Sequence, residues 1–534
     1  MKKLINILLG ALLVTFIGCA KVLDVEPYSA VPFATAFDTP DHCLLSLNGV
    51  YDAAQSGAYP GGTERRGYPF GAASIEQSDT RGEDLINLQS FFQITYQATY
   101  NPTSANNVAM WDNLYALINK ANVCIDGFQE AGKSGVLTPA IALEYEAECK
   151  FLRAMAHHEA VIHFSRPYLD GNGDSLGIPY RDFAISNVEA SNKIRETPRP
   201  KVAEVYTKIL SDLDFAETNL PATRSTAILK TTRATKAAAI ALKMRAKLHM
   251  GDWSGVITDG AKVVPAAVTP TSWTSVVSPI GGWVMSANVD GPFVNNANNE
   301  SIFSIKNDAQ DAPSTNGGLA AMFGAASLGG RGLVSVSPIL YNNTGWLCGN
   351  EDKRRTTLYV QGTNALATQS VFTNKFRDYT TRGDYAPMIR YPEVLLTLAE
   401  AEARQGAGVT QRALDLLNTV RNRALADLGN AYTLSSFADK VALVKAILLE
   451  RRIEFLAEGK RWGDISRNAK DPNYTTSGIP AKAINGAAGL TMYNCGTAYA
   501  PGQAAIPYSD YKFIWPIPND EVINNPIIKQ NPGY

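Results

Sequence analysis

Residues 127–134 contain residue types in the order of a phosphate-binding motif. The stretch from Gly127 to Ser134 reads G-F-Q-E-A-G-K-S and matches G-x-x-x-x-G-K-[ST]. The motif holds phosphate where a strand precedes it and a helix begins at its Lys, because backbone amides and the helix N-terminus supply the contacts. Here a long helical pattern precedes it, and Pro139 comes before the next one. We therefore interpret the stretch as a helix end in a glycine loop, and not as a nucleotide site.

Three closely spaced histidines raise the question of a zinc protease. His157, His158 and His163 surround Glu159 in H-H-E-A-V-I-H. The zinc motif is H-E-x-x-H, because residues i and i+4 share one face of a helix. His158 and His163 are five positions apart, about 140° around a helix, so they cannot both reach one ion. We expect histidines packed at a helix surface and no metal site.

Carboxylates that would suit glycoside hydrolysis gather at Asp79, Glu83 and Asp84. A glycosidase needs two carboxylates that flank the scissile bond. Nothing in the sequence singles out a pair from these residues, which lie in a polar stretch read as loop. We therefore predict a protein without enzymatic activity and without a cofactor.

The densest run of charge in the sequence is Glu450–Arg467, which reads E-R-R-I-E-F-L-A-E-G-K-R-W-G-D-I-S-R. Three glutamates recur in it every four residues and share one helical stripe: Glu450, Glu454 and Glu458. Arg451 and Arg461 stand at ion-pair spacing from that stripe, and Gly459 offers a left-handed helix end before Trp462. The run is a catalytic strip or a structural clasp. We favour the clasp, because charge runs on helices are usually solvated or mutually paired.

Aromatic residues in polar, glycine-rich loops are the candidates for ligand binding. Aromatic faces stack on sugar rings, and loop Asp, Asn and Arg side chains hydrogen-bond sugar hydroxyls. Core packing is the competing interpretation for each single ring. The predicted ligand-binding residues are Tyr68, Asp79, Trp273, Trp283 and Trp346.

The composition disfavours one class of partner, and the first residues indicate export. With 49 basic and 50 acidic side chains, the formal charge is −1, so the chain lacks the basic excess that attracts nucleic acid. Lys2-Lys3 and the apolar run 4–17 are typical of a signal peptide. We expect residues 1–18 to be removed and Cys19 to carry a bacterial lipoprotein anchor. An ordinary secretory signal with a chance Cys is the alternative.

Five cysteines remain after Cys19, so at most two disulfides can form. Cys124 and Cys149 lie in helical apolar patterns and are expected to be small buried side chains. Cys348 and Cys495 lie in glycine-containing, loop-like stretches. These two are the better candidates for a disulfide.

Apolar periodicity predicts a mainly α-helical chain. Small residues at helical spacing, followed by the turn Gly251-Asp252 and a second helical pattern, are typical of a tetratricopeptide unit. Residues 266–386 are rich in Gly, Asn, Ser and Thr, with Ile302–Ile305 as a candidate strand. Helical patterns run over 39–54, 108–128, 140–164, 201–220, 234–250, 390–405, 411–426 and 437–458. A further helical pattern follows the turn Gly251-Asp252 and continues through 264.

Four separate stretches share their residue patterns with one protein family. Glu450–Arg467 follows E-R-R-x-E-[FL]-x-x-E-G-x-R-W-x-D-[IL]-x-R, and Ala147–Phe164 follows A-E-x-x-F-L-R-A. Ile389–Glu402 and the tail Pro516–Tyr534 match two further segments, R-Y-A-E-V-x-L-x-x-A-E-A and a proline-rich ending in Q-N-P-G-Y. Together they resemble the SusD/RagB glycan-binding lipoproteins. Pro392 stands where Ala is usual, which is expected to shift the start of that helix.

The resemblance implies a tetratricopeptide-like helical scaffold with long loop-rich insertions and a few short strands, lipid-anchored at the outer-membrane surface. It implies capture of an oligosaccharide or polysaccharide for delivery to a SusC-like TonB-dependent transporter. A peptide ligand, as in RagAB-type importers, and a surface glycosidase are the alternatives. Residues 19–265 would form an N-terminal helical region. Residues 266–534 would form a C-terminal region, with a ligand-binding insertion at 266–386 and helices in 390–458, the whole making one compact unit.

Overall fold

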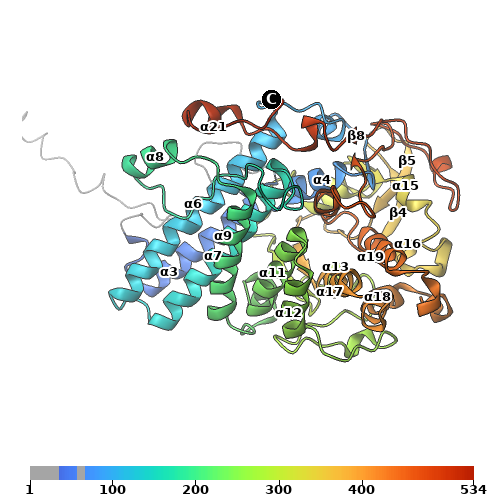
Figure 1. The fold of residues 1–534 in the computed structure, drawn as a ribbon, viewed down its shortest axis with the longest axis horizontal. Coiled ribbons are helices and arrows are strands. Elements are labelled where there is room, and N and C mark those ends of the chain that lie inside the picture. The colour runs from blue at the N-terminus through green and yellow to red at the C-terminus, as the bar shows by residue number, and fades with distance from the viewer. Residues whose placement is uncertain (1–34, 57–66) are drawn as a thin grey trace, which may run out of the picture.

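Long α-helices that pack one against the next form the scaffold of the structure, a computed structural model that describes residues 35–56 and 67–534 (Figure 1). The helices predicted from apolar periodicity are all present, with ends that differ by a few residues. The long helices are α3 (Pro40–Ser56), α6 (Ala105–Lys133), α7 (Pro139–Phe164), α9 (Val202–Asn219), α11 (Lys236–Met250), α12 (Trp253–Val263), α17 (Tyr391–Gln405), α18 (Gln411–Ala424) and α19 (Lys440–Glu454).

These helices form a continuous array in chain order. α3 packs on α6, α6 on α7, α7 on α9, α9 on α11, α11 on α12, and α12 on α17, which also contacts α18 and α19. The turn between α11 and α12 explains one such pair. Gly251 ends α11 in the left-handed conformation (φ +73°), and the Asp252 side chain caps α12 by accepting the Gly255 amide at 2.9 Å. The predicted tetratricopeptide-like architecture is confirmed.

The strands are short and pair two by two in antiparallel fashion. Ile302–Ile305 lies in one of them, as its apolar run predicted. The pairs are β1 (Leu85–Asn87) with β3 (Val334–Val336), β2 (Ser301–Ile305) with β6 (Ala386–Arg390), β4 (Tyr359–Thr363) with β5 (Gln369–Thr373), and β7 (Gly478–Ile479) with β8 (Ile506–Pro507).

Short helices fill the loop-rich segments between the long ones. Residues 127–133 lie inside α6 with no strand before them, so the phosphate-motif match is a helix end, as interpreted. The short helices are α4 (Ala72–Thr80), α5 (Gln93–Tyr96), α8 (Val188–Arg195), α10 (Ala227–Thr232), α13 (Gly291–Val294), α14 (Leu319–Phe323), α15 (Pro338–Tyr341), α16 (Lys353–Thr357), α20 (Arg461–Asn468) and α21 (Asn519–Asn524).

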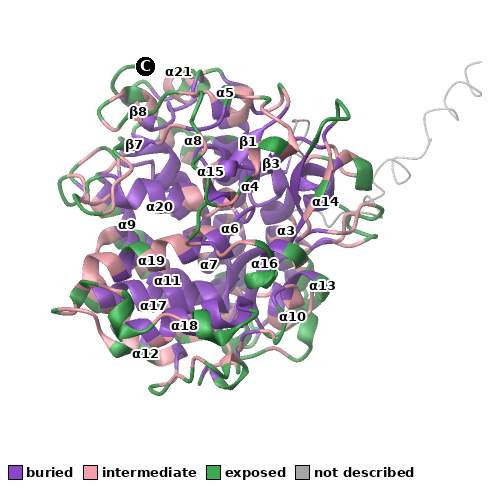
Figure 2. Cartoon of the chain, turned by 90° about the vertical axis from the view of Figure 1, so that its right-hand side faces the viewer, coloured by how far each residue is buried: buried purple, intermediate pink, exposed green. Residues whose placement is uncertain are grey.

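The buried side chains of the N-terminal and C-terminal helices belong to one extended hydrophobic core, seen as the buried interior of Figure 2. The tail joins that core through Phe513, Ile514 and Trp515, which are all buried. The Trp515 amide donates to the carbonyl of His163 at 2.9 Å and thereby fixes the tail to the end of α7. The division of the chain at residue 265 stays a prediction.

The acidic stripe of α19 is buried in a cluster of ion pairs. Glu454 accepts from Arg423 at 2.6 Å and from Arg390 at 2.9 Å, and Glu458 accepts from Arg390 and Lys375. Glu450 accepts from Arg354 at 2.6 Å. Burial alone raises a carboxyl pKa, but the three arginines around Glu454 hold its pKa well below the usual range. We call these seven residues the charge cluster; it joins α16, α18, α19 and β6.

The residues after Gly459 continue the clasp toward the N-terminal part of the chain. Arg461 pairs with Glu83 at 2.6 Å. The indole nitrogen of Trp462 donates to the carbonyl of Ile162, at the end of α7, at 2.8 Å. The prediction of a paired, buried clasp is confirmed, and the catalytic strip is not supported.

Two details of the predicted clasp are wrong. α19 ends at Glu454 and not at Glu458, so the three glutamates do not share one helical face. The expected pairs of the arginines with this stripe are not found among the described residues: Arg451 pairs with Asp464, further along the same run, and Arg461 pairs with Glu83 in the N-terminal part of the chain. Each buried arginine therefore pairs with the carboxylate that the tertiary fold places beside it.

Candidate ligand-binding site

Four of the five predicted ligand-binding residues are buried. Tyr68, Asp79, Trp283 and Trp346 each have an exposed fraction of 2% or less. The three aromatic side chains lie in irregular segments that fold inward, and Asp79 lies on α4, whose residues are all buried. The ligand roles of these four residues stay predictions. Trp273 is half-buried and donates its indole N–H to the Ala287 carbonyl at 3.3 Å. A ligand role for Trp273 stays a prediction.

The buried candidates have structural partners. Asp79 accepts the amides of Gly459 and Arg461 at 3.1 and 3.2 Å, so it holds the turn of the clasp, and burial raises its pKa to about 7. Trp346 lies under the Arg355 guanidinium, 4.3 Å from the ring centroid. Trp283 lies equally close to the Lys230 ammonium. These cation–π contacts stabilise both buried rings, but neither indole N–H has a hydrogen-bond acceptor among the described residues.

The histidines of α7 are packed within the scaffold, and two of the three are hydrogen-bonded there. His157 bonds the Arg153 carbonyl at 2.9 Å, and His163 bonds Glu159 at 3.1 Å. Burial lowers the pKa of His158 to about 3. Across residues 35–56 and 67–534, no group of three or more His, Cys, Asp or Glu side chains could hold a metal ion.

Residues 173–177 read G-D-S-L-G, the residue order of a hydrolase nucleophile turn. That turn joins a strand to a helix. Here no strand precedes Gly173, and Leu176 forms only an isolated bridge to Lys201. Ser175 is therefore assigned no nucleophilic role.

A hollow of about 380 Å³ opens on the surface of the predicted insertion. It lies where α13 meets the loop that precedes β6. This combination of an apolar wall, an amide, a guanidinium and carboxylates suits a polyhydroxylated ligand. The lining residues are Phe293, Val294, Asn296, Arg377, Asp378, Gly383 and Asp384.

The loop beside the hollow is held by its own aspartates. Asp378 accepts the amides of Thr380, Thr381 and Gly383 at 3.2, 2.8 and 2.8 Å. Partial burial raises a carboxyl pKa, but these bonds outweigh it and hold the pKa of Asp378 at about 2. Asp384 is buried, which raises its pKa, and it accepts the Asp378 amide at 2.8 Å. The loop is therefore preorganised without a ligand.

Several groups at the rim keep the capacity to bind. The Arg377 side chain is 32% exposed and donates to the Asn374 and Thr357 carbonyls at 2.7 and 3.2 Å and to the Asp290 carboxylate at 3.3 Å. Two of its five N–H groups stay available. Asn296 donates one amide hydrogen to Gly383 at 2.9 Å and has a second. Val294 is 59% exposed and supplies an apolar contact. These groups can hydrogen-bond hydroxyls and cover one apolar face.

Three of the five ligand-binding residues predicted from the sequence lie in this insertion, and none of the five lines the hollow. The prediction favoured Trp and Tyr, whereas the hollow includes Val294, Asn296 and Arg377. The usable signal was the asparagine-rich run 295–299 together with Arg377-Asp378 in the same polar segment. Their proximity depends on the pairing of β2 with β6, which the sequence does not reveal.

Comparison with known proteins identifies the class of this tetratricopeptide-like scaffold. Residues 334–534 match the profile of the SusD family, and residues 21–248 match a profile described as "Starch-binding associating with outer membrane". SusD-like protein P38 of Formosa agariphila is 24% identical over 582 residues that cover both chains completely. SusD-like protein P2 of the same organism is 25% identical and covers 98% of each chain. The chain belongs to the SusD family.

Solved structures share the fold. A SusD superfamily protein from Bacteroides fragilis has a TM-score of 0.72 and 26% identity, covering 92% of this chain and 99% of its own. Surface glycan-binding protein A from Bacteroides uniformis has a TM-score of 0.66 and 19% identity, with coverages of 92% and 99%. In the part of the chain that the structure describes, no helix is both long and apolar enough to span a bilayer. The predicted signal peptide and Cys19 lie outside the described residues.

Proposed function

We propose that this chain is a cell-surface glycan-binding lipoprotein that captures an oligosaccharide or polysaccharide and delivers it to a SusC-like TonB-dependent transporter. Membership of the SusD family carries the proposal. The family profile over residues 21–248 is described as starch-binding and associated with the outer membrane, which supports both the ligand class and the location. A lipid on Cys19 would anchor the chain there.

The hollow beside α13 is the proposed glycan site. It joins hydrogen-bond donors from Arg377 and Asn296 to the exposed apolar side chain of Val294. Its two carboxylates accept backbone amides of the loop itself. Asp378, with a pKa of about 2, is ionised at neutral pH and cannot act as a general acid, and Asp384 is engaged by backbone amides.

Binding to a polysaccharide panel tests the proposal, with reducing ends measured in parallel on a soluble form that lacks residues 1–19. We expect a glycan to bind without release of reducing ends. Release of reducing ends would favour the glycosidase, and binding of peptides alone would favour a peptide importer.

A space-filling substitution locates the site. Val294→Trp should weaken glycan binding at least about tenfold, because a large ring at an exposed position obstructs the hollow while burying nothing new. Val188→Trp on α8 is the matched control, since Val188 is 77% exposed and does not line the hollow. Equal affinities of the two variants and the parent for the glycan would exclude the hollow as the site.

A further inference from the structure

The hollow beside α13 carries a net negative charge. Asp378 and Asp384 line it, and the Arg377 guanidinium is the one cation among its described lining residues. Asp290, which precedes the first residue of α13, pairs with that guanidinium at 3.3 Å. The four side chains carry a charge of −1 when Asp384 is protonated and −2 when it is ionised. A ligand in the hollow therefore meets an excess of carboxylate.

Asp378 supplies a fixed negative charge without a free acceptor. Its carboxylate accepts the amides of Thr380, Thr381 and Gly383 and also the Thr381 hydroxyl. These bonds occupy the roughly four lone-pair sites of a carboxylate. With its pKa of about 2, Asp378 is ionised at neutral pH. Its effect on a ligand is therefore electrostatic, because it has no site left for a further hydrogen bond.

Three basic side chains lie in or near the hollow, and none of them lines it as an unpaired cation. Arg377 is paired with Asp290. Lys306 pairs with Asp308 at 2.5 Å and does not line the hollow. Arg382 belongs to the same loop, but its side chain packs over Gly318 and does not line the hollow either. The described residues thus offer no free counter-charge to an acidic ligand.

Two further cations lie against the Phe293 ring, which forms the apolar wall of the hollow. Lys375 and Arg390 are 5.2 and 5.3 Å from the ring centroid. Both are buried and both pair with Glu458, so their charges are balanced inside the charge cluster. A carboxylate on a ligand would lose water here without gaining a free cation, and that loss opposes binding.

Uncharged hydroxyl groups meet no such penalty. Two N–H groups of Arg377 and one of Asn296 stay available to donate. Val294 offers an apolar contact beside them. A sugar hydroxyl can accept these donors without being repelled by Asp378.

We propose that the hollow beside α13 selects uncharged glycans and rejects acidic ones, with Asp378 and Asp290 as the residues that set this preference. The inference rests on the proposed function and narrows the ligand class of the same site. Repulsion by one carboxylate close to a ligand charge near the protein surface corresponds to about a fivefold change in affinity.

Calorimetric titration of the full chain with size-matched polymers tests the preference. The probes are the hydroxyethyl and carboxymethyl ethers of starch, of cellulose and of galactomannan, with the same two ethers of any further polysaccharide that binds in the panel. We expect at least one hydroxyethyl ether to bind and its carboxymethyl counterpart to bind at least about fivefold more weakly. The difference should shrink as salt is added, because salt screens repulsion between charges.

Two charge-removing variants test the residues that set the preference. Asp290→Asn and Asp378→Asn should each reduce the difference between the two ethers at least about threefold. The Asp290 carboxylate bonds only Arg377 among the described residues, so its variant keeps the test valid if Asp378→Asn loosens the loop. Asp182→Asn is the matched control, because Asp182 is exposed, pairs with Lys208 and does not line the hollow. An equal reduction in all three variants would contradict a local effect.

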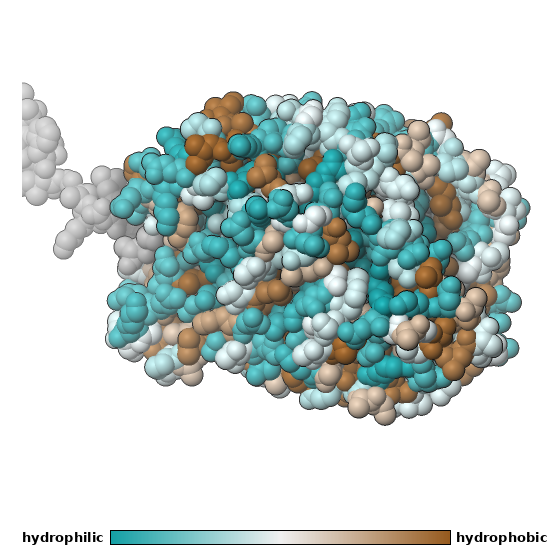
Figure 3. Space-filling view, in the orientation of Figure 1, coloured by the Kyte–Doolittle hydropathy of each residue, from teal (hydrophilic) through white to brown (hydrophobic). Residues whose placement is uncertain are grey.

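Two further variants assign the binding to the hollow. Val294→Trp should weaken binding of the hydroxyethyl ether at least about tenfold. An apolar patch lies over α21 on the face shown in Figure 3, and Ile523 of that helix is 67% exposed. A polymer adsorbed on that patch would depend on Ile523, so Ile523→Ser is the control and should bind as the parent does.

The possible failures are distinguishable. Binding of both ethers with equal affinity, or tighter binding of the carboxymethyl ether, would overturn this inference and leave the proposed function standing. Binding that is insensitive to Val294→Trp would remove the hollow and this inference together. Binding of no polysaccharide at all would overturn the proposed function as well.

Discussion

Trp462 is the side chain through which the clasp reaches both ends of the chain. Its indole is fully buried, and its ring lies 3.3 Å from the Arg81 guanidinium and 5.1 Å from the Phe513 ring. Its N–H donates to the Ile162 carbonyl. The residue therefore joins α4, the end of α7 and the C-terminal tail, and Arg81 depends on this ring for part of its buried environment.

Trp462→Ala should lower the free energy of unfolding by about 3–5 kcal/mol, because it opens a large cavity and leaves a buried carbonyl without its donor. Urea denaturation measures this loss. The glycan affinity of the folded fraction should stay unchanged, since Trp462 does not line the hollow beside α13. A variant of parental stability that has lost glycan binding would contradict the structural role.

Trp273→Ala tests whether this half-buried side chain contacts the glycan. Trp273 is half-buried, so its loss should change the free energy of unfolding by about 1 kcal/mol or less. Calorimetry with the glycan then decides its role. Unchanged affinity would remove the one predicted ligand residue that the structure leaves partly exposed.

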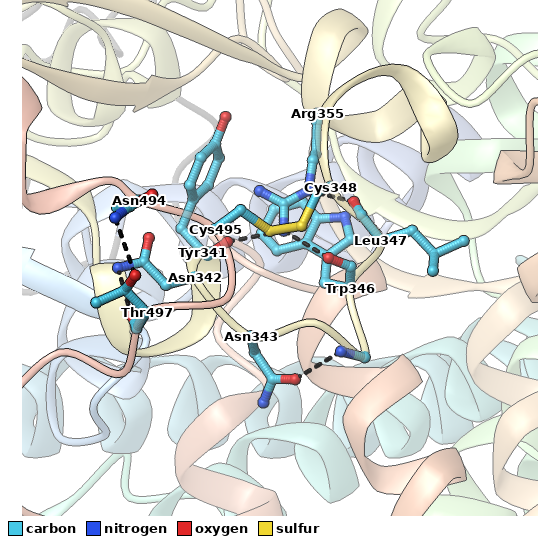
Figure 4. Close-up of a disulfide and its surroundings, with 11 residues drawn as sticks. Tyr341, Asn342, Asn343, Trp346, Leu347, Cys348, Arg355, Asn494, Cys495 and Thr497 are labelled. Carbon is cyan, nitrogen blue, oxygen red and sulfur yellow. Dashed lines mark hydrogen bonds between the residues drawn. A yellow bond between two sulfur atoms is a disulfide. The ribbon is translucent and has the colours of Figure 1, made fainter.

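At the scale of elements, a disulfide ties two irregular segments together. Cys348 and Cys495 are bonded, with Cα atoms 6.0 Å apart, as the loop-like surroundings of these cysteines predicted (Figure 4). Arg355 lies beside the bond and donates to the Trp346 carbonyl at 2.6 Å. The Asn342 side chain also holds the second segment, because it donates to the carbonyls of Met492 and Thr497.

Replacing both cysteines by Ser should lower the free energy of unfolding by about 2–4 kcal/mol, because the bond closes a long loop, with 147 residues between its ends in sequence. Amide exchange of 490–497 should accelerate, because this segment loses its covalent tie, while the long helices keep their protection, because neither cysteine lies in one of them. Hydrogen-exchange mass spectrometry separates the two regions. Faster exchange throughout α17 and α19 would show that the bond supports the scaffold and not only the loops.

The elements themselves were predictable where periodicity is strong. α6, α7 and α11 follow from apolar spacing and a Gly-Asp turn, because local sequence determines a helix that has one buried face. The end of α19 at Glu454 was missed, since the pattern of glutamates continues to Glu458 while the backbone turns earlier. Periodicity carries no information about a helix end that tertiary contacts impose.

Across the whole molecule, the candidate site was less predictable than the scaffold. Glycine-rich surroundings suggested an exposed Trp346, but the ring is covered by Tyr341 and Tyr359, which lie within 5.4 Å of its centroid. The ion pairs of the charge cluster join residues far apart in sequence, such as Arg390 and Glu458. Which segments meet is a property of the tertiary fold, and one sequence without an alignment does not contain it.

The same long-range ion pairs make the stability of the whole molecule depend on pH. Burial opposes ionisation, but Arg461 and Arg452 hold the pKa of Glu83 at about 2, and Arg245 does the same for Glu393. Because these folded-state pKa values lie below the unfolded value of about 4.3, their stabilisation is complete above that pH and is lost as pH falls toward 2. Burial lowers the pKa of His158 to about 3, so protonation of the unfolded chain also removes stability below about pH 6.5.

Asp79 acts in the opposite sense over part of this range. Its raised pKa of about 7 means that the folded chain takes up a proton between about pH 7 and 4 before the unfolded chain does, which offsets part of the histidine loss. We therefore expect the urea midpoint to fall gradually between pH 7 and 4 and more steeply below 4. In Asp79→Asn, the urea midpoint should fall more steeply between pH 7 and 4 and as in the parent below pH 4, because an amide does not titrate. A midpoint that stays constant from pH 4 to 2.5 would contradict the role assigned to the arginine-paired glutamates.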